Sequence, residues 1–233
     1  MTNTNPIADT TTSRDTPLIE VSHVSVEYQM AEDRVGTLKE FALQALKRQR
    51  TLRRFEAVKD VSFTVRRGET LALIGPNGAG KTTLMKVVAR VLPPTKGRVI
   101  VRGNLAPMIA LGAGFNPEVS GYDNIILFGT LLGRDPEHMR GRVPVIAEWA
   151  GLTEFIQTPV RNYSSGMTAR LGFAVAADVD PDVMVVDEVL SVGDQVFQKK
   201  SIERMQSHMS GGTAVLLVSH ALDQVEKMAD RVI

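Results

Sequence analysis

A glycine-rich loop that ends in a lysine and two threonines is the part of the chain best suited to chemistry. The stretch "GPNGAGKTT" occupies residues 75–83 and fits the pattern G-x-x-x-x-G-K-[ST]. Its glycines let successive backbone N–H groups point at phosphate oxygens, and the helix that follows adds the positive end of its dipole. We expect this loop to bind the phosphates of a nucleotide through Gly75, Pro76, Asn77, Gly78, Ala79, Gly80, Lys81, Thr82 and Thr83.

Two side chains of the loop have specific tasks in such a site. The Lys81 ammonium supplies positive charge for the β- and γ-phosphates, and the Thr82 hydroxyl is a ligand for Mg²⁺. The alternative is a glycine-rich turn that binds nothing. The hydrophobic pattern predicts a buried strand before the loop and a helix after it, and this order favours phosphate binding.

A pair of carboxylates follows a second buried strand. Asp187 and Glu188 come directly after the apolar run "VMVV", so both emerge at the carboxyl end of a strand, where ligands of open α/β sheets lie. Asp187 suits the coordination sphere of the metal, and Glu188 suits orienting and deprotonating the water that attacks the γ-phosphate. The alternative for the pair is a solvated acidic turn.

The next strand ends in a histidine, and a serine pair precedes a helix. A lone histidine at a strand end is usually structural, but His220 beside a γ-phosphate can polarise the phosphate or the water. We interpret it as catalytic because the other parts of such a site are present. Ser164, Ser165 and Gly166 directly precede an apolar helix, so they are either a second anion site or an ordinary helix N-cap.

These residues need buried strands and helices to position them, and the hydrophobic pattern predicts an α/β fold. The first strand, at residues 18–28, changes phase near Ser22 and His23, as a bulged strand would. Pro144 interrupts a mostly helical stretch, so we expect it to start a new helix or to mark a kink. We predict further strands at residues 57–65, 70–75, 98–103, 182–188 and 213–220, and helices from residue 81, within 124–156, at 167–177 and at 221–230.

The composition of the chain excludes several kinds of functional site. The 233 residues carry 27 basic and 26 acidic side chains, so no global field attracts nucleic acid. The lack of cysteine excludes disulfides, thiolate metal sites and a cysteine nucleophile, and it fits a cytoplasmic location. No run of 18 apolar residues occurs, so we do not expect the chain to cross a membrane by itself. We interpret the polar residues 1–16 as a disordered tail.

Taken in order along the chain, the phosphate loop, "YSSGM", "VVDE", "SVGD" and the final "VSH" resemble the ATP-binding subunit of ABC transporters. The resemblance covers residues 19–233. It implies an α/β P-loop NTPase fold, with an ABC ATPase core made of a RecA-like lobe and a β-subdomain. An α-helical signature subdomain would lie at about residues 119–180, inside one ABC ATPase domain at residues 17–233.

The resemblance also gives each motif a role. It makes residues 75–83 the Walker A loop, 163–167 the signature motif and 191–194 the D-loop. Asp187 and Glu188 would be the Walker B aspartate and the catalytic base, with His220 as the switch histidine and with ATP and Mg²⁺ as cofactors.

In this family two copies close head to tail. The region of Ser165 in one copy would then meet the γ-phosphate held by Lys81 of the other. Tyr28 lies where the family stacks an aromatic ring on adenine. The alternatives are that Tyr28 is a core residue at the end of its strand, and that Phe55 is the stacking residue.

One subfamily resembles the chain best. The wording "YSSGM", the stretch "LGAGFNPEVSGYDN" at residues 111–124 and an insertion after the first strand are similar to polysaccharide exporters of the Wzt, teichoic-acid and wall-galactan type. This resemblance implies an ATPase at the cytoplasmic face of the cell membrane, bound to a separate polytopic membrane subunit that moves a lipid-linked glycan. The alternatives are the ATPase of another ABC transporter, a soluble ABC ATPase acting on nucleic acid, and a phosphotransferase.

Two stretches depart from the common family pattern. Most ABC ATPases carry a glutamine that touches Mg²⁺ in the loop before the helical subdomain, but no glutamine occurs at residues 86–155. The "GAGFNPE" loop fills that place, with Asn116 as a candidate substitute. Residues 31–55 form a basic insertion that we expect to be an amphipathic helix, either along anionic lipid or packed on its own sheet.

Overall fold

The computed structural model describes residues 16–31, 52–109, 111–187, 193–219 and 222–233. A five-stranded parallel sheet forms the centre of the structure, in the order β5-β6-β7-β3-β8. Every residue of its β3 and β7 strands is buried, as expected for strands covered on both faces. The strands are β5 (Leu105–Met108), β6 (Val183–Asp187), β7 (Ala214–Val218), β3 (Thr70–Leu73) and β8 (Arg231–Val232).

A three-stranded antiparallel sheet packs beside it, in the order β2-β1-β4. Its strands are β2 (Leu52–Val65), β1 (Ile19–Ala31) and β4 (Lys96–Val101). The predicted bulge is confirmed, because the register of β1 shifts between Val21 and Val24 and His23 has a positive φ of 50°. Hydroxyl groups satisfy the freed amides there: His23 N donates to Ser62 Oγ (2.8 Å) and Asp60 N donates to Ser25 Oγ (2.9 Å).

The prediction of a helix over the whole basic insertion is wrong at both ends. Ala31 belongs to β1 and residues 52–55 belong to β2, where Ala31 is the register partner of Leu52. The helical spacing of apolar residues is confined to residues 38–46, whereas the two ends continue the paired strands β1 and β2. Residues 32–51, which carry most of the predicted helix, lie outside the described part of the chain, as does the predicted tail at residues 1–15.

The described helices have clear start signals. The side chains of Ser120, Asp135, Ser164 and Asp194 each accept a hydrogen bond from the backbone N–H three residues later, which satisfies an amide that the helix leaves free. The α-helices are α2 (Lys81–Val88), α3 (Gly121–Leu131), α4 (Pro136–Ala150), α5 (Ser165–Asp178), α6 (Gln195–Ser210) and α7 (Leu222–Met228), and two 3₁₀ turns are η1 (Thr153–Phe155) and η2 (Val160–Asn162).

Pro144 lies inside α4, so the prediction that it starts a new helix is wrong, and the alternative of a kink stays a prediction. Proline has no N–H for the carbonyl of Arg140, but both residues are exposed, so water can satisfy that carbonyl. The neighbouring residues Val143, Ile146 and Ala147 are buried and hold the helix against α3 and α5.

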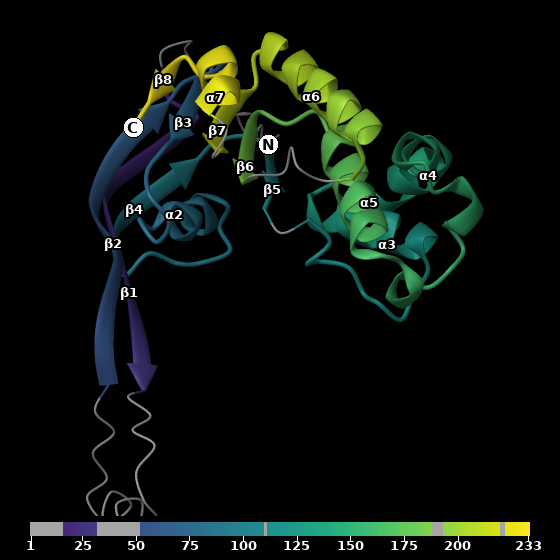
Figure 1. Ribbon diagram of the computed structural model, residues 1–233, viewed down its shortest axis with the longest axis horizontal. Coiled ribbons are helices and arrows are strands. Elements are labelled where there is room, and N and C mark those ends of the chain that lie inside the picture. Colours follow the sequence, from purple (N-terminus) through teal and green to yellow (C-terminus); the bar gives the residue numbers. More distant parts are fainter. Residues whose placement is uncertain (1–15, 32–51, 110, 188–192, 220–221) are drawn as a thin grey trace, which may run out of the picture.

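Helices α3, α4 and α5 form a group on one side of the molecule, opposite β1, β2 and β4 (Figure 1). Three aromatic rings join this group to α6. Trp149 of α4 stacks on Phe173 of α5, with centroids 5.6 Å apart, and meets the edge of Phe197 of α6 at 5.1 Å. Lys200 Nζ lies 4.6 Å from the centroid of the Trp149 ring and donates to the Trp149 carbonyl (3.1 Å).

Candidate nucleotide-binding site

The phosphate loop has the strand, loop and helix that the sequence predicts. It follows the buried strand β3 and ends at α2, which begins at Lys81. Gly80 has a φ of +88°, and a Cβ atom there would lie 2.2 Å from the carbonyl oxygen of Ala57 in β2. The missing side chain therefore lets the loop lie against the antiparallel sheet.

A cavity of about 320 Å³ opens over this loop. Its walls come from three places that are far apart in the sequence: the β1–β2 ribbon, the loop with the start of α2, and the carboxyl ends of β6 and β7. The lining residues are Tyr28, Phe55, Ala57, Asn77, Gly78, Ala79, Gly80, Lys81, Thr82, Thr83, Asp187 and Val218. The structure thus brings together most of the predicted site, while Gly75 and Pro76 are not among the lining residues.

Gly75 and Pro76 contribute through their backbone. The Lys81 ammonium donates to the carbonyl of Gly75 (2.6 Å) and to that of Pro76 (2.9 Å), so it lies over the loop at the cavity wall. An ammonium on a flexible stem can turn from these neutral carbonyls to a phosphate, which is a stronger partner because it is charged.

Thr82 and Asp187 are the predicted metal ligands, and both line the cavity. Asp187 ends β6, where it is the register partner of Val218 in β7. A hydroxyl and a carboxylate are oxygen donors of the kind that Mg²⁺ prefers, and Mg²⁺ completes its octahedron with water and substrate phosphates. These two residues therefore fit a magnesium ion held together with a nucleotide.

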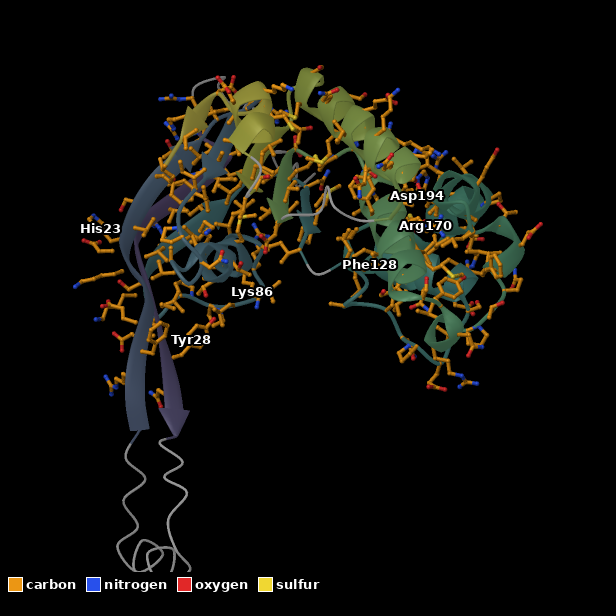
Figure 2. The ribbon with its side chains drawn as sticks, in the orientation of Figure 1. His23, Tyr28, Lys86, Phe128, Arg170 and Asp194 are labelled. Carbon is orange, nitrogen blue, oxygen red and sulfur yellow. The ribbon has the colours of Figure 1, made fainter. Side chains whose placement is uncertain are left out.

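Tyr28 and Phe55 are register partners on β1 and β2, and both line the cavity. The exposed fractions of the two residues are 36% and 50%, so Tyr28 is not the fully buried core residue of the alternative interpretation. Figure 2 shows Tyr28 on the ribbon below the phosphate-loop helix. Two exposed rings next to a phosphate loop suit a flat heterocyclic base.

The signature serines lie elsewhere in the molecule. Ser164 caps α5, accepting from Met167 N at 3.2 Å, and Ser165 begins the helix. Ser164 and Ser165 are exposed, and neither they nor Gly166 line the cavity. Within one chain, the second candidate anion site is therefore separate from the first.

Four predicted residues lie outside the described part of the chain: Glu188, Ser191, Val192 and His220. Their roles stay predictions. Asp194, the last residue of the predicted D-loop, is described, and its carboxylate accepts from Phe197 N (2.9 Å) at the start of α6.

Asn116 does not reach the cavity. Its side-chain oxygen accepts from Glu118 N (3.0 Å), a local turn that occupies the group proposed to replace the missing glutamine. Ala57 and Val218 line the cavity but are absent from the sequence prediction, because both are apolar residues whose place depends on long-range strand pairing.

Residues 58–191 match a protein family described as "ABC transporter". The match includes the phosphate loop, the signature turn and Asp187. The chain belongs to the ABC transporter family. Its predicted fold class and its ATPase activity are thereby confirmed, with ATP as the nucleotide.

Similar ABC proteins carry names that agree with the predicted subfamily. The O-antigen export system ATP-binding protein RfbB of Klebsiella pneumoniae is 46% identical over 223 residues, covering 93% of this chain and 89% of that protein. The teichoic acids export ATP-binding protein TagH of Listeria monocytogenes is 38% identical over 215 residues, covering 92% of this chain but 63% of that protein. The resemblance to polysaccharide exporters is therefore confirmed.

Solved structures of ABC cassettes share the fold. An ATP-binding subunit of an ABC transporter has a TM-score of 0.71 at 22% identity and covers 93% of this chain and 85% of that one. A dimeric cassette in a post-hydrolysis state, bound to ADP and Pi, also has a TM-score of 0.71, at 19% identity, with 92% and 93% coverage. Among the described residues of this ABC protein, no helix is long and apolar enough to span a bilayer.

Proposed function

We propose that this ABC ATPase powers the export of a lipid-linked polysaccharide, such as O-antigen, teichoic acid or cell-wall galactan, across the cytoplasmic membrane. The observation that carries the proposal is the cavity in which the phosphate loop, Asp187 and the aromatic pair meet. The transported substrate is argued from relatives that are named for O-antigen and teichoic acid export.

ATP binds across this cavity. Lys81 and the loop amides hold the β- and γ-phosphates, and Tyr28 with Phe55 receives the adenine. Thr82 and Asp187 hold Mg²⁺, which when bound neutralises charge on the phosphates. Glu188 follows Asp187 directly and accepts a proton from the attacking water, while His220, two residues beyond the last residue of β7, contacts the γ-phosphate.

Hydrolysis requires a second copy of the chain. The signature residues Ser164, Ser165 and Gly166 are separate from the cavity of their own chain, so they are available to the nucleotide of a partner copy. The N-terminus of α5, a helix of 14 residues, directs its free amides at that phosphate. Two nucleotides are then held head to tail between two copies.

A separate polytopic membrane subunit carries the glycan and holds the ATPase at the cytoplasmic face of the membrane. The names of the relatives, which are ATP-binding proteins of export systems, support this part of the proposal. Nucleic acid is not a substrate in this proposal, and the nearly balanced charge of 27 basic and 26 acidic residues agrees with that.

The test is reconstitution of the chain with its membrane subunit in vesicles that contain a lipid-linked glycan. We expect ATP turnover and glycan transport, and we expect Lys81→Ala to reduce turnover by about 100-fold or more, because charge on the γ-phosphate loses its main partner. The control is Arg140→Glu, an exposed change on α4 away from the cavity. Turnover that survives Lys81→Ala, or turnover without any glycan movement, would contradict the proposal.

A further inference from the structure

Two segments run antiparallel to each other, and the second of them leads into the signature turn. Residues 116–122 lead into α3, and residues 156–161 lead towards Tyr163; we call them the loop pair. Their backbones share hydrogen bonds from Tyr122 N to Ile156 O (2.8 Å), Gly121 N to Thr158 O (3.2 Å), Val160 N to Val119 O (3.0 Å) and Arg161 N to Pro117 O (2.9 Å).

A fully buried asparagine fixes the shape of the first segment. Asn124 is 0% exposed, and its Oδ1 accepts from Asn116 N (2.7 Å). Its Nδ2 donates to the carbonyls of Asn116 (2.9 Å), Val119 (3.2 Å) and Ser120 (2.9 Å). A buried amide with this many partners holds the backbone in one arrangement.

The residues before the loop pair lie against the signature helix. A Cβ atom on Gly112 would be 2.6 Å from Thr168 Cγ2, and one on Gly172 would be 2.8 Å from Gly112 N. The loop that leaves β5, which is paired with the Asp187 strand β6, is thus in contact with α5 at its start and with the residues before α5 at its end.

An exposed ion pair closes the loop pair at the end nearest the signature turn. The Arg161 guanidinium donates to the Glu118 carboxylate, and Arg161 is three residues before Ser164. The two side chains are 55% and 66% exposed, so this pair contributes little to the stability of the whole fold. What it does fix is the position of Arg161 relative to the loop.

We propose that Glu118 and Arg161 are positioning residues, which hold the signature serines in the orientation needed to reach the nucleotide of the partner copy. The inference rests on the proposed head-to-tail ATPase. A helix N-terminus that binds phosphate acts over hydrogen-bond distances, so a small displacement of the signature turn weakens the contact. In this chain, the loop without glutamine therefore acts on the signature turn through the ion pair and the paired backbones.

The test uses the full chain with Glu188→Gln, which we expect to retain ATP, and measures ATP-dependent dimerisation by sedimentation. We expect Glu118→Arg and Arg161→Glu each to weaken the dimer about tenfold, since each dimer contains two such ion pairs and each contributes up to a few-fold. The double exchange, Glu118→Arg with Arg161→Glu, should restore dimerisation to within about twofold because the attraction is re-formed. Binding of a fluorescent ATP analogue to the monomer should stay within about twofold throughout.

The matched control is the ion pair of Glu137 and Arg140 on α4, whose side chains are 77% and 54% exposed. Reversing either charge there should leave dimerisation unchanged. If the Glu188→Gln parent does not dimerise with ATP, the head-to-tail ATPase is wrong and the positioning role falls with it.

Other outcomes would reject only the positioning role. One is a parent that dimerises while the Glu118 and Arg161 reversals dimerise equally well. Another is a double exchange that recovers nothing. A third is a fall in both the melting temperature and the affinity for the ATP analogue beyond the α4 controls, which would make the ion pair merely structural.

Discussion

Tyr28 and Phe55 lie directly opposite each other on β1 and β2, and both rings face the cavity of the phosphate loop. The ribbon thus presents two aromatic side chains, where the sequence suggested a choice between them. We expect Tyr28→Ala and Phe55→Ala each to weaken ATP binding about five- to tenfold, because base–aromatic stacking contributes about 1–3 kcal/mol. Titration with a fluorescent ATP analogue measures this affinity. Phe155→Ala is the control, since Phe155 is 48% exposed and does not line the cavity. Unaltered affinity in both the Tyr28 and Phe55 variants would show that adenine binds elsewhere.

Gly80 and Gly78 form a matched pair for testing the phosphate loop. Both have a positive φ, +88° and +82°, but a Cβ at Gly80 would overlap the Ala57 carbonyl whereas one at Gly78 would meet nothing within 4 Å. We expect Gly80→Ala to lower the free energy of unfolding by about 2 kcal/mol more than Gly78→Ala, because only the first adds a clash to the backbone strain. Urea denaturation without nucleotide measures the difference. Equal losses of unfolding free energy would show that β2 can move away from the added Cβ without destabilising the fold.

Replacing Asn124 should lower the free energy of unfolding more than replacing most other polar residues. Asn124→Leu keeps the size of the side chain but removes the acceptor of Asn116 N and takes one hydrogen bond from each of three carbonyls. We expect the free energy of unfolding to fall by about 2–4 kcal/mol, because the four hydrogen bonds of the buried Asn124 side chain are lost together. Urea denaturation followed by circular dichroism measures the loss. The exposed Asn162 gives the control, Asn162→Leu, and a loss no larger than that of the control would contradict the assignment.

His208 makes the stability depend on pH. Burial lowers the pKa of His208 and the Arg204 charge lowers it further, while the hydrogen bond between Nε2 and the Ala177 carbonyl (3.1 Å) and the charge of Asp180 oppose this. Since the folded chain favours the neutral ring, His208 supports folding above its unfolded pKa of about 6.5 and loses this contribution as the pH falls below it. His208→Gln should therefore show a smaller fall in unfolding free energy between pH 7 and pH 5 than the parent. Denaturation curves at several pH values measure this, with exposed His138→Gln as control; parallel pH profiles would refute the role.

The sequence predicted the parts of the fold whose signals are local. The glycine spacing of the phosphate loop, the apolar runs of β3, β6 and β7, and the phase change at Ser22 and His23 each depend on neighbouring residues only. Strand β5 was not predicted because it is four residues long and contains Pro107, which removes a donor from the ladder. Helix α6 was not predicted because its buried stripe includes the polar residues Ser201 and His208 beside Phe197 and Met205, which hides the apolar period.

The candidate site likewise contains residues that local motifs predict and residues whose place depends on long-range strand pairing. Lys81, Thr82 and Asp187 were found from motifs, and the structure brings them to one cavity. The pairing of Phe55 with Tyr28 depends on the register of two strands separated by an insertion, which no local pattern fixes. Asn116 does not line the cavity and its side-chain oxygen is taken up by a local turn to Glu118 N, so its role in place of the glutamine stays a prediction.

Trp149 is the only tryptophan in the chain, and it lies where α4, α5 and α6 meet. Its indole contacts two phenylalanine rings that also contact each other, and it lies close to the Lys200 ammonium, so its fluorescence depends on neighbours on two other helices. If the signature-bearing helices rotate against α6 when two copies close on ATP, those neighbours change. The protein therefore carries its own optical probe of that movement, at a position that needs no added dye and no substitution.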